Sequence, residues 1–346
     1  MKKIVSLILI FVFCLLSFNI GTYANNNEQD PYYDFHMQVS SAIEEMRFER
    51  NKKIQAVEDQ MDNLKTFATD LLNERATYSV EKENTYKNIT KKLSQLNSEV
   101  QEIKKEYSTS LEYYLENIGF VLIDDNIDFE HTDKKIVHTS ASTDANYMQT
   151  TSTLTYYPAT KEFYYYVEYD YNQKNLFGAY VGLSDSAGDY DLVSMQHKES
   201  TDWYWNNIIV SAEFADTTMG NGFAGKADKY GIISNCFVPD SPSRVSNRSD
   251  FWNGCVFNVD DTACKYYEYN SEIRYVTLEG WLQSSGTATS SAVKSEYEHN
   301  YEKWVWDKVA VSGVNLNDAS FSMEVSYSEL SGVWQRSAGS RVCTLP

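Results

Sequence analysis

The feature that most constrains the fold is a long stretch without glycine or proline, which runs from Phe35 to Ile118. Helix-favouring residues, chiefly Glu, Lys, Gln and Leu, are frequent in this stretch, and Gly119 follows it directly. Because glycine and proline most often interrupt or end helices, the stretch predicts helical structure almost throughout. We therefore assign residues 35–118 to a helical stalk.

Apolar side chains recur in this stretch at steps of three and four, the heptad spacing of a coiled coil. One series is Ile54, Val57, Met61, Leu64, Ala68, Leu71 and Tyr78, with Arg75 in the slot between the last two. A second is Tyr86, Ile89, Leu93, Leu96, Val100, Ile103 and Tyr107. The second series is shifted by four residues, a stutter that a continuous helix absorbs by local unwinding. We expect one continuous helix, on the order of 120 Å long at 1.5 Å per residue.

A helical hairpin that bends within residues 76–85 is the alternative, because the shift lies near the middle of the stretch. The two arrangements differ in what covers the apolar stripe. A continuous helix needs a partner chain, so it predicts self-association through the helical region, whereas a hairpin supplies its own partner.

Residues 119–346 have a different pattern, in which Tyr, Val, Thr, Phe and Trp alternate with polar residues between recurrent turn clusters. This pattern is typical of an all-β domain of about ten to twelve strands, and a sandwich fits it better than a barrel. The expected fold class is therefore segregated α+β, a coiled-coil-like helix or helical hairpin followed by a β-sandwich.

The N-terminus has the features of a secretory signal peptide: two lysines, an apolar stretch from Ile4 to Ile20, and small residues up to Ala24. We expect cleavage after Ala24, with an uncleaved membrane anchor as the alternative. Residues 25–34, which are polar, form a predicted flexible segment. Removing residues 1–24 leaves 28 basic against 49 acidic residues, a net charge of −21. This charge argues against nucleic acid as a partner, because a phosphate backbone would be repelled.

Four cysteines remain after residue 24, and an even number in a secreted chain predicts two disulfides. Cys255 and Cys264 flank a short segment with Asp260 and Asp261 at its centre, as in a β-hairpin. We predict a Cys255–Cys264 bridge, which leaves Cys236 to pair with Cys343.

The sequence KEFYYYVEYDY, residues 161–171, is the strongest candidate for a ligand site. Alternation along a strand places Phe163, Tyr165, Val167, Tyr169 and Tyr171 on one face, which we predict to be buried. The opposite face combines Tyr164, Tyr166, Glu168 and Asp170. Since carboxylates are not left unpaired in a dry core, we predict that Tyr164 and Tyr166 are at least partly exposed, and the face they share with Glu168 and Asp170 is a candidate sugar-binding surface. The alternative is that both pack under a loop or the helix.

Further candidate sites are weaker. Trp203 and Trp205 share one face at a spacing of two and would form a binding patch if exposed. Asp185, Asp189 and Asp191 surround a glycine turn and could supply oxygen ligands to calcium, although their spacing differs from that of an EF-hand. We expect no other cofactor.

No catalytic motif is present, and the five histidines are scattered along the chain; we expect His299, beside Glu296 and Glu298, to lie on the surface.

The sequence thus favours a secreted, non-enzymatic binding protein in which a helical stalk presents an aromatic β-sandwich to a glycan or surface protein. One alternative is an extracellular polymer-degrading hydrolase whose paired carboxylates meet only in space. Another is a membrane-acting toxin, for which the Ser/Thr-rich segments 138–157 and 283–299 would be the pore-lining candidates.

Overall fold

The computed structural model describes residues 30–73, 80–123, 148–171, 190–198, 201–215, 222–238, 241–260, 264–266, 269–271, 273–300, 306–315, 320–327 and 333–345. The predicted signal peptide lies outside the described residues, as do Asp185 and Asp189. No helix in the described ranges is long and apolar enough to cross a membrane.

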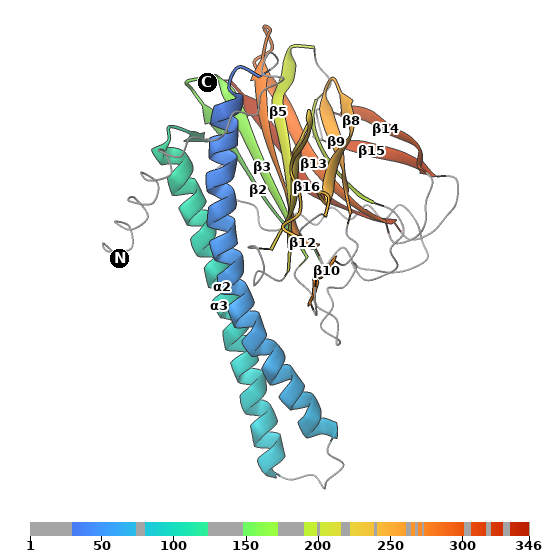
Figure 1. The fold of residues 1–346 in the computed structure, drawn as a ribbon. Helices are drawn as coiled ribbons and strands as arrows, with labels where there is room; N and C mark the ends of the chain where they lie inside the picture. Colours follow the sequence, from blue (N-terminus) through green and yellow to red (C-terminus); the bar gives the residue numbers. More distant parts are fainter. Residues whose placement is uncertain are drawn as a thin grey trace.

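The helical region forms two helices, α2 (Tyr33–Asn73) and α3 (Val80–Asn117), which pack side by side as a hairpin (Figure 1). The prediction of one continuous helix is therefore wrong. The four-residue phase shift marks the connection between two helices, and residues 74–79 between them overlap the alternative bend at 76–85. Folding back lets each apolar stripe bury itself against the other helix, so no second chain is needed to cover it.

Local sequence explains where the hairpin begins and ends. The Asp30 side chain accepts a hydrogen bond from the backbone N–H of Tyr32 at 2.9 Å, and Pro31 precedes the first helical turn. At the far end, Gly119 has a φ of 101°, and the N–H groups of Gly119 and Phe120 donate to the carbonyls of Glu116 and Leu115. This pair of bonds is a Schellman motif, which favours glycine at the left-handed position.

The rest of the described chain is β-structure, and every pairing among its described strands is antiparallel. One sheet has seven strands in the order β1 (Val121–Leu122), β2 (Met148–Tyr157), β3 (Glu162–Tyr171), β12 (Ile273–Ser284), β5 (Trp203–Phe214), β6 (Phe223–Asp228) and β7 (Gly231–Ser234). A second sheet has five, in the order β16 (Val333–Thr344), β13 (Ser290–Asn300), β4 (Asp191–His197), β9 (Gly254–Val259) and β8 (Val245–Phe251). Two two-stranded sheets pair β10 (Cys264–Tyr266) with β11 (Tyr269–Ser271) and β14 (Trp306–Asn315) with β15 (Ser320–Tyr327). The protein is thus α+β, with two helices before a β-rich domain.

Strand β3 covers all but the first residue of the aromatic segment 161–171, and it lies inside the seven-stranded sheet between β2 and β12. Its predicted core face is confirmed, because Phe163, Tyr165, Val167, Tyr169 and Tyr171 belong to one buried cluster that includes residues of both large sheets. This cluster is the main hydrophobic core of the β-rich domain.

The hairpin has two parts with different surroundings. Near the sheet, Val39, Ile43, Leu111 and their neighbours share a buried cluster with Tyr164, Tyr166 and Trp281. Farther along, a second cluster contains Ile54, Val57, Leu96 and Val100, all from the two helices. Figure 1 shows the far end of the hairpin projecting beyond the sheets. The helices therefore cover one face of the seven-stranded sheet with one half and extend past it with the other.

The predicted disulfide pairing is wrong, because Cys236, Cys255 and Cys343 are buried and none of the three is in a disulfide. Among the described strands, the one that contains Cys255 and the one that contains Cys264 do not pair with each other. Strand β9 pairs with β4 and β8, while β10 pairs with β11 in a separate small sheet. Short separation along the chain therefore does not bring Cys255 and Cys264 onto neighbouring strands. Cys236, Cys255 and Cys343 all pack within the main core.

Candidate binding site

The face of β3 predicted to bind a ligand is covered by the helical hairpin. Tyr164 and Tyr166 are both 0% exposed, so the prediction that they are partly exposed is wrong, and the alternative that they pack under the helix is confirmed. The Tyr164 hydroxyl donates to Glu279 at 3.0 Å, and the Tyr166 hydroxyl lies 3.2 Å from that of Tyr107 on α3. Ligand binding by this face remains a prediction that would require the hairpin to move.

The carboxylates of that face are also buried, because the helices supply cations to them. Arg50 Nη1 lies 2.6 Å from Glu168 Oε1, and Lys104 Nζ lies 2.7 Å from Asp170 Oδ2. Burial alone would raise the pKa of Asp170, but Lys104 and then Arg274 outweigh it and lower that pKa to about 2. The reasoning that carboxylates are not buried alone was correct, while the conclusion that they face solvent did not follow.

More ion pairs join the hairpin to the same sheet face. They are Arg47 with Glu213, Glu58 with Arg274, Glu44 with Lys226, and His36 with Glu162. Burial raises the pKa of Glu213 to about 7 despite the charge of Arg47. These four pairs connect α2 to strands β3, β5, β6 and β12. Their paired state gives no support to a catalytic role.

The other predicted site residues that the structure describes are buried in the fold. Trp203 and Trp205 lie in the main core, 1% and 6% exposed, so they are not a surface patch. Asp191 is buried at the start of β4 and accepts hydrogen bonds from Tyr297 at 2.6 Å and His299 at 2.8 Å. His299 is therefore buried rather than at the surface. Among the described residues, no group of three or more His, Cys, Asp or Glu side chains is arranged to hold a metal ion.

The two Ser/Thr-rich segments enter different sheets. The described part of the first forms β2, which pairs with β1 and β3 in the seven-stranded sheet. The second contributes β13, which pairs on both sides, with β4 and with β16. These strands are therefore not neighbours in a single hairpin.

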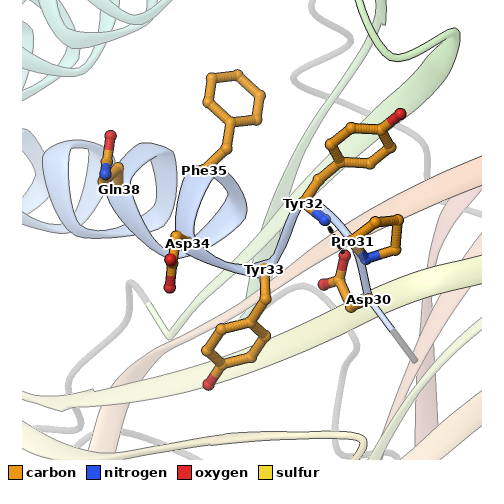
Figure 2. A pocket seen from close by; sticks show the side chains of 7 residues that line it. All are labelled: Asp30, Pro31, Tyr32, Tyr33, Asp34, Phe35 and Gln38. Carbon is orange, nitrogen blue, oxygen red and sulfur yellow. Dashed lines mark hydrogen bonds between the residues drawn. The ribbon is translucent and has the colours of Figure 1, made fainter. Parts of the chain in front are cut away.

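A surface pocket of about 390 Å³ lies at the start of α2 and is the candidate site that the structure adds. It is lined by Asp30, Pro31, Tyr32, Tyr33, Asp34, Phe35 and Gln38 (Figure 2). The rings of Tyr32, Tyr33 and Phe35 are half-buried, whereas Asp34 and Gln38 are exposed. Figure 2 shows the rings of Tyr32 and Tyr33 directed to opposite sides of the chain.

Several pocket residues contact side chains outside the pocket. The Phe35 ring stacks on Tyr157 with centroids 4.7 Å apart, and Asp30 is hydrogen-bonded to His36 at 3.0 Å. Burial, followed by the charge of Asp228 on β6, raises the pKa of Tyr33 to about 12, so its hydroxyl stays protonated at neutral pH. Phe35 thus connects the pocket to β2, and Tyr33 connects it to β6.

Two polar side chains in the pocket are available to a ligand. Asp34 and Gln38 are four residues apart and therefore lie on the same face of α2. Within the described part of the chain, neither side chain takes part in a hydrogen bond. Half-buried rings beside an exposed carboxylate and an exposed amide can stack on an apolar ligand face and bind hydroxyl groups.

Sequence reasoning missed this pocket because it assigned residues 25–34 to a flexible segment. The signal was present in Asp30-Pro31-Tyr32-Tyr33, where an acidic residue and a proline precede a helix and two rings follow. That pattern predicts an ordered helix start with aromatic side chains fixed beside it.

Comparisons with known proteins do not identify a family. No protein-family pattern matches the sequence, and no curated protein matches it. Among solved structures, one described as "Pore forming protein" is similar with a TM-score of 0.23 and 10% identity, over 63% of this chain and 88% of that chain. Another, described as "AvmM Catalyzes Macrocyclization in Alchivemycin A Biosynthesis", has a TM-score of 0.17 and 9% identity, over 39% of this chain and 64% of that chain. Likenesses at these TM-scores carry no argument about function.

Proposed function

We propose that this protein is a secreted, non-enzymatic binding protein that recognises a glycan in the pocket at the start of α2. The observation that carries the proposal is that half-buried rings, Tyr32 and Tyr33, line one pocket together with the exposed polar groups of Asp34 and Gln38. Sugars offer apolar ring faces and hydroxyl groups together, and this combination of side chains matches both.

The architecture is part of the same proposal. The two large sheets form a β-sandwich, which is supported by the cluster of buried residues that they share. The hairpin is a coiled-coil-like stalk, which is supported by the apolar cluster between its helices beyond the sheet. Secretion rests on the signal-like N-terminus, and sequencing of the exported protein is expected to begin at Asn25.

A glycan array followed by calorimetry on the best ligand tests the proposal. We expect Tyr32→Ala and Asp34→Asn to weaken binding by about tenfold or more, since each removes one kind of contact. Tyr113→Ala is the matched control, because Tyr113 is 57% exposed on α3 and does not line the pocket. Binding that survives both pocket substitutions, or an array without any bound glycan, would overturn the proposal.

We also propose self-association through the helical region, by a surface other than the apolar stripe that first suggested it. The stripe that suggested it is covered within the hairpin, but Phe67 and Tyr86 near the projecting end are 52% and 44% exposed. Exposed rings on a projecting element favour contact with another protein. Sedimentation of the full chain, compared with a Phe67→Ser/Tyr86→Ser variant, measures whether a concentration-dependent dimer forms and whether these rings hold it.

A further inference from the structure

His36 lies on α2 next to the pocket, where it contacts the lining residue Asp30, and it is 0% exposed. Its Nδ1 lies 3.0 Å from Asp30 Oδ2, and its Nε2 lies 3.1 Å from Glu162 Oε2 on β3. Ionised carboxylates only accept hydrogen bonds, so both ring nitrogens must donate for both contacts to form. Only the protonated imidazolium has two N–H donors, so the observed geometry is that of a charged His36.

A third contact also favours the charged form. The His36 ring stacks on Trp281 of β12 with centroids 4.0 Å apart and an interplanar angle of 15°. A cation over the face of an indole is attracted by the negative charge density of that face. Trp281 is itself fully buried, so this contact is protected from solvent.

The surrounding charges come from several elements. Glu162 also accepts hydrogen bonds from Thr160 and from Asn206 of β5, both neutral. Asp30 interacts electrostatically with Tyr33, Lys229 and Tyr230. Burial by itself lowers the pKa of His36, but Asp30 and Glu162 outweigh it, so this pKa is raised above 6.5. Its proton therefore stabilises the fold below about pH 6.5, and this stabilisation is lost as pH rises through the raised value.

His36 is connected to the pocket through one residue. Asp30 bonds His36 with Oδ2 and accepts the Tyr32 backbone N–H with Oδ1 at 2.9 Å. Asp30 and Tyr32 both line the pocket. When His36 loses its proton to solvent, one of its two carboxylate contacts loses its donor, and Asp30 and Glu162 face each other without a cation between them.

We infer that His36 is a pH-responsive positioning residue: in its protonated form it holds Asp30 and the Tyr32 turn in the binding shape of the pocket, and its deprotonation releases them. The inference rests on the proposed function only for its consequence, a weaker grip on a glycan at alkaline pH. The coupling of His36 to the shape of the pocket can be measured without any ligand.

Nuclear magnetic resonance of the full chain with labelled His and Tyr rings tests the coupling between pH 5 and 9. We expect the His36 resonance, assigned from its loss in His36→Gln, to titrate with a midpoint above 6.5. The Tyr32 and Tyr33 ring resonances should shift with the same midpoint, and that shift should be absent in His36→Gln. A His36 midpoint below 6.5, or tyrosine resonances that ignore it, would refute the inference.

A second variant keeps the test valid if His36→Gln does not fold. Glu162→Asn retains polar character but removes one of the two carboxylates, so the His36 midpoint and the tyrosine midpoint should both fall together. Midpoints that move separately would again refute the coupling.

With a glycan from the array, the dissociation constant should rise about tenfold between pH 6 and pH 9 in the native chain. Intact coupling with no glycan binding at any pH would overturn the proposed function alone. Glycan binding that is equally tight at both pH values would overturn the inference alone.

Discussion

The docking of the helical hairpin on the sheet can be tested at Arg50, which joins the two through several contacts. Arg50 Nη1 lies 2.6 Å from Glu168 Oε1, and its guanidinium lies over the rings of Tyr107 and Tyr275 at 4.4 Å and 5.0 Å. The side chains of Arg50 and Glu168 are each 5% exposed. Replacing Arg50 with Ala would leave a buried carboxylate without its cation.

We expect Arg50→Ala to lower the free energy of unfolding by about 3–5 kcal/mol, the usual cost of removing one partner of a buried ion pair. Arg50→Met combined with Glu168→Leu should recover most of that loss, because buried pairs are often replaced by apolar residues at little net cost. Urea unfolding followed by helical circular dichroism measures each value. Lys65→Ala is the control, since Lys65 pairs with Asp62 at 52% exposure and should cost about 1 kcal/mol or less.

The reasoning would be refuted if Arg50→Ala cost no more than Lys65→Ala. The guanidinium would then not be buried between the hairpin and the sheet. If instead the double variant were as unstable as Arg50→Ala alone, the loss would come from the packing against Tyr107 and Tyr275 rather than from the unpaired charge.

Three further predictions follow from the same geometry. Tyr164→Ala should cost about 3–5 kcal/mol of stability in thermal or urea melts, as for a large buried ring, whereas Tyr113→Ala on the open face of α3 should stay within about 0.5 kcal/mol; equal effects would show that the hairpin does not cover β3. Asp170 should contribute roughly 2 kcal/mol above about pH 3.8, and because its pKa is lowered to about 2, this contribution should disappear as pH falls from 4 to 2. Between pH 4 and pH 2, the free energy of unfolding should depend less steeply on pH in Asp170→Asn than in the native chain. An equal pH dependence in the two proteins would contradict this assignment of the pKa. Burial raises the pKa of the Cys255 and Cys343 thiols, so both should react with a thiol reagent only after unfolding. Rapid labelling of the native chain would contradict their burial, and a non-reducing peptide map that shows either one in a disulfide would contradict their free state.

Local sequence rules predicted the elements of this protein well. The absence of glycine and proline between Phe35 and Ile118 predicted helices, and Gly119 marked their end. Alternation along β3 predicted which five of its side chains enter the main core. These features depend on neighbours a few residues away, whose backbone and side-chain preferences are the same in many proteins.

Tertiary structure alone decided what covers each surface. The Glu168 carboxylate is buried because Arg50, 118 residues earlier in the chain, reaches it from the hairpin. Tertiary structure also decided that the helices fold back on each other and bury their apolar stripes within one chain. It likewise placed Cys255 and Cys264 in different sheets, although the two are close in sequence. Alternation divides a strand into two faces, but it carries no information about the partner of each face. That partner is chosen by the global minimum of the free energy, which favours large buried apolar area and paired charges. The pocket around Asp30 and the two carboxylates around His36 could therefore be identified only once α2 was placed on β3 and β12.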